Sequence, residues 1–289
     1  MTDTLTTAPP SSDRAPTGPA TGAAASGVPA LLSDTMVFAR RNIQHIRQIP
    51  EKLLDVTVQP IMFVLLFAYV FGGAITGAGN YREYLIGGIL VQSLGFGMVG
   101  PATSIATDLT EGVVDRFRTL PTNRAAYLLG HFVAELAGMV LAMAILMGTG
   151  LLVGWRTHSS VVEVAGSIGL LLLFASAMIW IGTWIGMLVR SPDAVMGIAF
   201  TVIFPLTFMS NAFVPIKSMP NVLQWVASWN PISAMVAAVR ELFGNPAAPI
   251  AKDVWPMQHP VAAATIYCTL LLAAAVPLAL HRFRTRTTD

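Results

Sequence analysis

Two ionisable side chains lie one helical turn apart inside an apolar segment. His131 and Glu135 are four residues apart, so on a helix they share one face. Ionisable groups inside a membrane-spanning helix are functional candidates by default, and such a pair could relay protons. No other apolar segment has a carboxylate at a matching depth to continue the path. We therefore favour a second interpretation, in which the pair lies near the cytoplasmic boundary, within reach of water and Arg124.

The sequence lacks the usual motifs for phosphate and metal chemistry. No G-x-x-x-x-G-K-[ST] loop occurs, because none of the three lysines has a glycine-rich lead-in. The five histidines are scattered, without an H-E-x-x-H motif or a Cys/His cluster. The single cysteine, Cys268, lies in an apolar run and can form no disulfide within the chain. We expect no catalytic residue, metal site or cofactor in this chain, and no ATP hydrolysis by a phosphate loop of its own.

The composition indicates a membrane protein. Of the 289 residues 54% are hydrophobic and 11% are charged, whereas a soluble domain has roughly 25% charged residues. The net charge of +2 is too balanced to suggest a nucleic-acid binder. Apolar runs recur that can cross a hydrocarbon core of ~30 Å, for which about 20 helical residues suffice. The predicted fold class is all-α, a polytopic membrane protein surrounded by lipid.

Charged residues delimit six predicted spans. They are residues 56–73, 84–107, 127–153, 164–189, 194–214 and 261–280. An even number of spans places both termini on one side of the membrane. Lys and Arg number 12 in the segments on that side and 5 on the other, and three of the five lie in a long loop of little weight. The distribution therefore predicts cytoplasmic N and C termini.

The N-terminal part differs from the rest of the chain. Residues 1–30 are rich in Thr, Ala, Pro, Ser and Gly, which predicts a disordered cytoplasmic tail, and they lack the features of a signal peptide. From residue 33 to 49 the pattern becomes amphipathic, which predicts a helix on the membrane surface that ends at Pro50. The alternative is a soluble amphipathic helix. Residues 31–286 then form one transmembrane domain.

The stretch between residues 215 and 260 is neither a clean span nor a polar loop. It contains Trp225, Trp229 and Trp255, and tryptophan is enriched at the membrane–water boundary. We interpret it as short helices that lie in, or dip into, the outer interface before the last span. Residues 232–243 are too few to cross as a seventh span.

Glycine pairs and prolines leave alternatives open. Gly182 and Gly186 form a G-x-x-x-G pair in the fourth span, which could build the helix bundle or a dimer contact. Pro101 and Pro205 lie in the second and fifth spans, where each could break its helix or only kink it.

The loop DLTEGVVDRFRTLPTNRAAYLL is the most informative segment. Val113, Phe117 and Leu120 fall on one helical face before Pro121, with charged residues around them. The pattern predicts a short cytoplasmic amphipathic helix, suited to a groove on a partner protein.

The order E-G-x-x-D-R-F-R-T-L-P in this loop resembles the segment of ABC type-2 export permeases that engages the ATP-hydrolysing subunit. The stretch FPLTFMSNAFVPIKSMPNVLQWVASWNPISAMVAAVREL is similar to the signature of the drug-resistance branch, the daunorubicin and doxorubicin permease group. The resemblance covers residues 34–286. The first 30 residues match nothing in that family.

The resemblance implies the export of a hydrophobic drug, secondary metabolite or lipid-like molecule from the cytoplasm or inner leaflet of a bacterial inner membrane. The permease would form a homodimer above two copies of an ATPase subunit, which hold ATP and Mg²⁺, and would work by alternating access. By resemblance, the ATPase contact comprises Glu111, Asp115, Arg116, Phe117, Arg118, Arg40 and Arg47. The substrate path would include Gln92, Phe96, Met98, Phe208 and Asn211. The outer gate would include Phe213, Pro215, Trp225, Trp229, Asn230, Pro231 and Arg240.

Other functions remain open. Within the family, the cargo could be a polysaccharide or a glycolipid. A secondary transporter would follow an ion gradient and continue after ATP depletion. A membrane-embedded enzyme, such as a lipid transferase, would need a cluster of carboxylates or histidines near one interface, for which the sequence gives little support.

Overall fold

The computed structural model describes residues 58, 61–71, 81–112, 124–189, 191–246 and 252–285. This part of the chain is helical and contains no strand, which confirms the all-α prediction. The predicted tail at residues 1–30 and the predicted surface helix at residues 33–49 lie outside the described residues. So does most of the charged loop, from residue 113 to 123.

Six helices form the bundle of the described structure, and several further helical segments accompany them. The bundle helices are α3 (Tyr81–Phe96), α4 (Val99–Thr110), α6 (Arg124–Val153), α7 (Val161–Gly186), α8 (Pro192–Phe208) and α12 (Pro260–Thr285). The other segments are α9 (Asn221–Trp229), α10 (Pro231–Phe243), α11 (Trp255–Gln258), the 3₁₀ helix η2 (Ile216–Ser218) and the π-helix η1 (Leu66–Phe71). The π-helix continues a helical segment that is described from residue 61.

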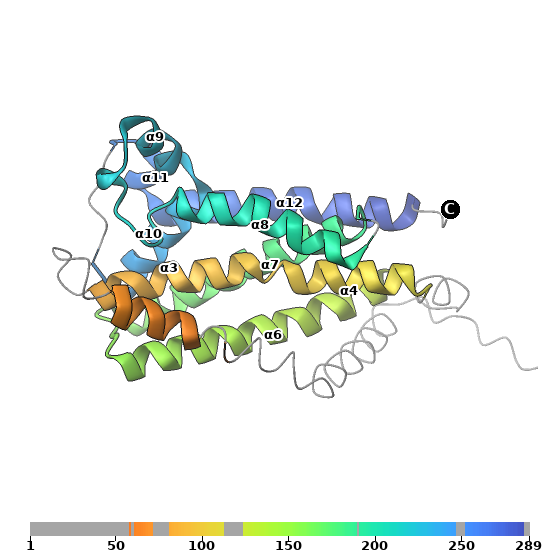
Figure 1. Cartoon of the computed structure of the whole chain (residues 1–289), viewed down its shortest axis with the longest axis horizontal. Coiled ribbons are helices and arrows are strands. Elements are labelled where there is room, and N and C mark those ends of the chain that lie inside the picture. The colour runs from red at the N-terminus through yellow and green to blue at the C-terminus, as the bar shows by residue number, and fades with distance from the viewer. Residues whose placement is uncertain are drawn as a thin grey trace, which may run out of the picture.

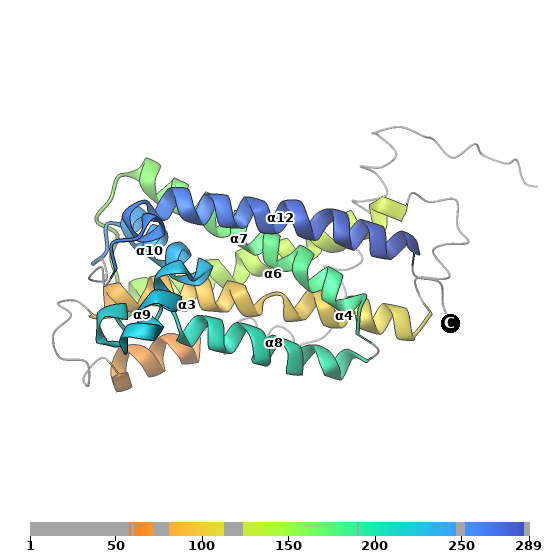
Figure 2. The same ribbon diagram turned by 90° about the horizontal axis from the view of Figure 1, so that it is seen from above.

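The bundle helices run side by side (Figure 1), and α7 is the central one, with contacts to α3, α4, α6, α10 and α12. Helices α9, α10 and α11 gather at one end of the bundle, which we call the short-helix end (Figures 1 and 2). At the opposite end, which we call the far end, α4 and α12 terminate and α6 begins. The core is therefore organised around α7.

In the described part of the chain, four helical segments are long and apolar enough to cross a membrane. They are Tyr81–Thr110, Tyr127–Val153, Val161–Gly186 and Pro260–Phe283. They correspond to the second, third, fourth and sixth predicted spans, and they identify the chain as an integral membrane protein. The fifth predicted span is the shorter apolar helix α8, and the first falls on a partly described segment. The number of six spans stays a prediction.

The short helices predicted before the last span are present. Helices α9 and α10 meet at a bend of 70°, at Asn230. The side-chain oxygen of Asn230 accepts a hydrogen bond from the Ile232 N–H, which caps α10, and Pro231 occupies the first helical position. Gly244 ends α10 with a φ of 65°, a left-handed conformation that glycine adopts without strain.

The two predicted helix breakers behave differently. Pro101 has no N–H to donate to the carbonyl of Gly97, four residues earlier, and the helix is interrupted there, between the end of α3 at Phe96 and the start of α4 at Val99. Pro205 lies inside α8, which ends three residues later at Phe208. The chain then turns through residues 209–213 toward η2.

The G-x-x-x-G pair of α7 packs against α4 within the chain. A methyl group added at Gly182 would lie 2.2 Å from the carbonyl oxygen of Met98, and one at Gly186 would lie 2.4 Å from that of Ala102. Both distances are too short for a Cβ atom. The pair therefore lets two backbones approach closely, and its contact belongs to the bundle.

Candidate functional site

A fully buried arginine joins three elements at the short-helix end. Arg240 of α10 has no solvent-exposed surface. Its Nε donates to the carbonyl oxygen of Tyr84 at 2.8 Å, while its Nη1 and Nη2 donate to those of Asn211 and Ala212, each at 2.9 Å. The guanidinium carbon also lies 3.5 Å from the ring centroid of Tyr84. In the described part of the chain, no carboxylate forms an ion pair with it.

The turn after α8 explains why a cation is buried here. The last carbonyls of a helix have no partner within the helix and must be satisfied by other groups. Asn230 Nδ2 donates to the carbonyl oxygens of Leu206 and Met209, at 2.7 and 2.9 Å. Arg240 donates to two carbonyls further along the turn, those of Asn211 and Ala212, so Asn230 and Arg240 hold the turn after α8 at two points.

The same turn is held from α3 and from a second residue of α10. The Tyr84 hydroxyl donates to the carbonyl oxygen of Asn211 at 2.8 Å, and the Asn211 N–H donates to Ser233 Oγ at 3.2 Å. A methyl group added at Gly88 would lie 2.1 Å from the Ala212 oxygen, so α3 approaches the turn in backbone contact. We call Tyr84, Asn211, Asn230, Ser233 and Arg240 the arginine network.

The carboxamide of Asn211 is an exception within this network. Its Oδ1 atom is buried and makes no hydrogen bond, although Asn211 is only 2% exposed. A buried acceptor without a donor is unfavourable and rare. The network therefore contains an acceptor that a rearrangement could satisfy.

The predicted substrate-path residues separate into two groups. Phe96 and Phe208 belong to a row of aromatic rings along α8, in which neighbouring ring centroids are 4.3 to 6.1 Å apart. The row consists of Phe96, Phe200, Phe204, Phe208, Phe213 and Phe67. By contrast, Gln92, Met98 and Asn211 are buried in the interior. The structure places only the first group on an accessible surface.

The predicted outer-gate residues lie between the end of α8 and the end of α10. Asn230 and Arg240 belong to the arginine network, and Pro231 begins α10 beside it. Phe213 is buried within the aromatic row, between Phe208 and Phe67, and Pro215 precedes η2. Trp225 and Trp229 are each 53% exposed on α9, and the Lys252 ammonium lies 5.8 Å from the ring centroid of Trp225. The structure therefore joins two of the predicted residues, Asn230 and Arg240, and leaves the two tryptophans of α9 at the surface.

Sequence reasoning missed the part that α3 plays in this network. Tyr84 entered the analysis only as the start of a span, yet its ring, hydroxyl and carbonyl all contact the arginine network. Tyr84 and Arg240 are 156 positions apart in the chain. A backbone carbonyl carries no signal in the sequence, so no pattern could have paired the two residues.

The predicted partner-contact residues are mostly outside the described structure. Only Glu111 is described, as the exposed residue that follows α4 at the far end. Asp115, Arg116, Phe117, Arg118, Arg40 and Arg47 lie outside the described residues. Their assignment stays a prediction.

His131 and Glu135 occupy the same face of α6, as their spacing predicts. His131 Nε2 lies 4.0 Å from Glu135 Oε1, and the His131 side chain is buried. A methyl group added at Gly100 of α4 would lie 3.0 Å from Glu135 Oε2, so the carboxylate faces α4. Among the described residues, no group of three His, Cys, Asp or Glu side chains could hold a metal ion.

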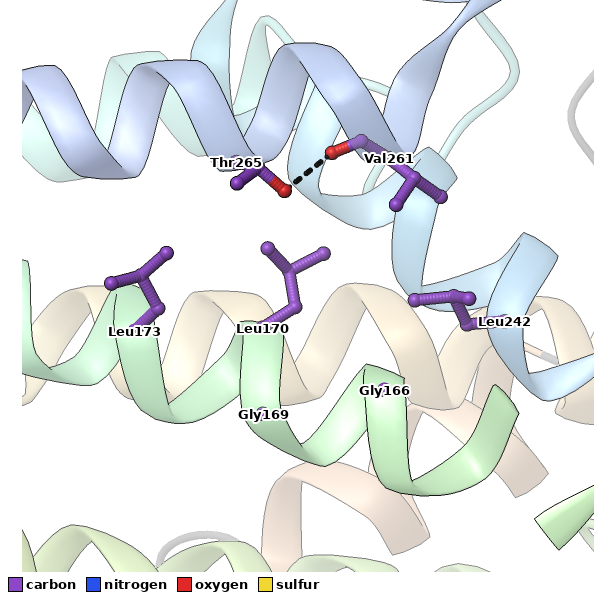
Figure 3. Close-up of a pocket in the computed structure, with 7 residues that line it drawn as sticks. All are labelled: Gly166, Gly169, Leu170, Leu173, Leu242, Val261 and Thr265. Atoms are coloured by element: carbon purple, nitrogen blue, oxygen red, sulfur yellow. Dashed lines mark hydrogen bonds between the residues drawn. The ribbon is translucent and has the colours of Figure 1, made fainter. Parts of the chain in front are cut away.

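An apolar groove lies between α7, α10 and α12 (Figure 3). Its volume is about 250 Å³, and it is lined by Gly166, Gly169, Leu170, Leu173, Leu242, Val261 and Thr265. The hydroxyl of Thr265, the one polar side chain in the lining, donates to the carbonyl oxygen of Val261 in its own helix at 2.7 Å. The groove therefore offers contact to hydrocarbon but no polar group that is free to bind a ligand.

Comparison with known proteins finds one transporter family and several transport permeases. The family model for the ABC-2 type transporter matches residues 33–243. The daunorubicin resistance ABC transporter permease protein DrrB1 of Streptomyces coeruleorubidus is 34% identical over 212 residues, which cover 73% of this chain and 75% of that protein. The doxorubicin resistance ABC transporter permease protein DrrB of Mycobacterium tuberculosis is 25% identical over 240 residues, with 80% and 83% covered. The putative transport permease ycf38 of Cyanophora paradoxa is 22% identical over 221 residues, with 74% and 75% covered.

Proposed function

This chain belongs to the ABC-2 type transporter family, and we propose that it is the permease subunit of an ATP-driven exporter for a hydrophobic drug, secondary metabolite or lipid-like molecule. Members of the family are membrane transport subunits, and a separate subunit hydrolyses ATP. The observation that carries the proposal is the family match over residues 33–243, which includes both the charged loop and the arginine network.

The proposed assembly contains two copies of this chain and two copies of the ATPase, which holds ATP and Mg²⁺. We place it in a bacterial inner membrane, with both termini in the cytoplasm and the short-helix end outside. The helical segment at residues 61–71 and helix α8 would then be parts of the first and fifth of six spans within a domain of residues 31–286. The positive-inside distribution of Lys and Arg supports this orientation.

The aromatic row supports a route for apolar cargo along α8. Phe200, Phe204 and Phe208 are 43 to 51% exposed, and Phe96 of α3 extends the row. Such rings bind apolar and aromatic molecules through large contact areas. Gln92, Met98 and Asn211 would join this route only after a rearrangement of the helices around them, because all three are buried in this conformation.

Export should depend entirely on the ATPase. Reconstituted alone in liposomes, the chain is expected to accumulate no more doxorubicin than protein-free liposomes do, with or without a proton gradient. Adding the ATPase and ATP should produce accumulation against the gradient. The measurement is the fluorescence of doxorubicin inside and outside the vesicles. Uphill transport by the chain alone, driven by protons or sodium, would identify a secondary transporter and refute the proposal.

Charge reversal in the loop tests the ATPase contact. Arg116→Glu combined with Arg118→Glu is expected to abolish co-purification of the ATPase and to reduce drug efflux to background. Charged groups fix the register of docking, and like charges opposed at an interface cost several kcal/mol. The yield of the folded permease should be unchanged.

The matched control reverses two exposed charges at the opposite end of the bundle, Arg156→Glu with Lys217→Glu. This control should leave ATPase co-purification and drug efflux near the wild-type level. Normal efflux by the Arg116 and Arg118 double variant would show that the loop is not the docking site.

A further inference from the structure

A polar and aromatic contact joins three helices at the far end of the bundle. The Tyr127 hydroxyl of α6 donates a hydrogen bond to Asp108 Oδ2 of α4. The Tyr127 ring also stacks on Phe283 of α12, with centroids 5.8 Å apart and planes inclined by 11°. We call Asp108, Tyr127 and Phe283 the far-end clamp.

The clamp lies at the base of the charged loop. Helix α4 ends at Thr110, just after Asp108, and α6 begins at Arg124, just before Tyr127. Residues 113–123 connect these two helices. The hydrogen bond between Asp108 and Tyr127 therefore ties together the two flanks of the loop, and the ring stack ties them to the C-terminal end of α12.

The clamp rests on an apolar cluster of its own. Tyr127 and Phe283 are each 7% exposed. Their cluster is separate from the main core and draws on α4, α6, α7 and α12: Ile105, Leu128, Trp180, Met187, Ala275 and Ala279. The clamp is therefore packed against residues of four helices, and close-packed interiors have low compressibility and transmit strain.

We propose that Asp108 and Tyr127 are positioning residues that transmit ATP-driven movement of residues 113–123 to the membrane helices. The inference rests on the proposed function, in which the loop contacts the ATPase. A ligand shifts a conformational equilibrium only through contacts that differ between the two states. The hydrogen bond makes both flanks follow the loop together. Without it, the ATPase still binds and hydrolyses ATP, but α4 and α6 respond separately.

Two single substitutions remove the hydrogen bond from opposite sides. Tyr127→Phe keeps the ring that stacks on Phe283, and Asp108→Ala leaves that stack untouched. In proteoliposomes that hold the complex of permease and ATPase, each is expected to lower the doxorubicin exported per ATP hydrolysed at least about ten-fold, the lower end of the effect that loss of a hydrogen bond to a charged group has on a two-state equilibrium. ATPase co-purification and the rate of ATP hydrolysis should stay at the wild-type level.

The double variant tests whether the two residues act through one bond. Tyr127→Phe with Asp108→Ala should be no worse than either single variant, because residues that share one interaction are not additive. Asp108→Asn, which keeps an acceptor oxygen, should retain most of the coupling. Tyr267→Phe, the same change nearer the short-helix end of α12, should have no effect.

A second readout does not require a transported molecule. Ser210 is buried beside the arginine network, so a cysteine placed there in a Cys268→Ala background reports opening of the short-helix end. ATP should accelerate its labelling by a membrane-impermeant thiol reagent in the otherwise unchanged complex. Tyr127→Phe and Asp108→Ala should each remove that acceleration.

The outcomes separate the two proposals. If reversing Arg116 and Arg118 leaves efflux intact, the proposed docking site fails. If that reversal abolishes efflux but Tyr127→Phe keeps the normal ratio and the normal labelling response, only the clamp inference fails. A purely structural clamp would instead lower thermal stability and ATPase co-purification together in both Tyr127→Phe and Asp108→Ala, and that result would also overturn the inference. If Tyr127→Phe does not assemble, Asp108→Ala decides alone.

Discussion

Replacing Arg240 with methionine is expected to lower the free energy of unfolding by about 3 kcal/mol or more and to abolish export. Methionine fills a similar volume but donates no hydrogen bond. The carbonyl of Ala212 would be left buried without its partner, and those of Tyr84 and Asn211 would each lose a donor. Hydrogen bonds to charged groups contribute about 1.5–3 kcal/mol each. The contact with the Tyr84 ring would be lost as well.

Unfolding in mixed detergent micelles would measure the loss of stability in Arg240→Met. Arg282→Met is the matched control, because Arg282 is exposed on α12 and its replacement should change stability little. Arg240→Lys should fall between wild type and methionine, since an ammonium keeps the charge but cannot reproduce the planar fork of donors. If Arg240→Met unfolds at the wild-type detergent concentration, the network does not hold the turn after α8.

The arginine network also suggests why this part of the chain is built from broken helices. A buried cation in a membrane protein is costly and usually marks a functional site. Here it binds neutral backbone carbonyls on a turn between α8 and η2, an arrangement that a small shift of α10 could exchange for another. The unpaired Oδ1 of Asn211 provides an acceptor for a second arrangement. These features are consistent with the proposed outer gate.

The sequence predicts the residues of this site better than their contacts. The family resemblance selects Asn211, Asn230 and Arg240, and the structure places all three in one network. The resemblance also assigns Asn211 to the substrate path and Arg240 to the outer gate, and so treats the two residues as parts of separate sites. Their contact runs through backbone carbonyls and through Tyr84, which depend on how α3 packs against the turn. That packing is a property of the folded chain.

In the fold, too, features set by neighbouring residues are predicted from the sequence, whereas features set by contacts between distant residues are not. The length of an apolar run is local, so four of the predicted spans appear as span-length helices. Helix ends are less predictable. Both Pro101 and Pro205 qualify as helix breakers, but only Pro101 separates two helices that together have the length of one span. The end of α8 is set instead by the hydrogen bonds that α10 supplies to its last carbonyls.

Glycine spacing shows most clearly which contacts cannot be predicted from the sequence alone. The pair Gly182 and Gly186 has a spacing that suits either an intrachain or an intermolecular helix contact. The structure shows the backbone of α4 against both residues. Gly138 of α6 has no heavy atom within 4 Å of the position that a methyl group would take. Replacement by alanine is therefore expected to have opposite effects on stability at Gly182 and at Gly138.

Gly182→Ala is expected to destabilise the protein by about 1–3 kcal/mol, as overpacking of a core does. The new methyl group would meet the Met98 carbonyl oxygen at 2.2 Å, and because that atom belongs to the backbone, α4 and α7 must move apart. Gly138→Ala should instead be neutral or stabilise by up to about 1 kcal/mol, because alanine favours a helix over glycine. Unfolding in mixed micelles compares the two variants. Equal stability would refute the close contact between α4 and α7, since both changes add one methyl group to a helix and differ only in what that group meets.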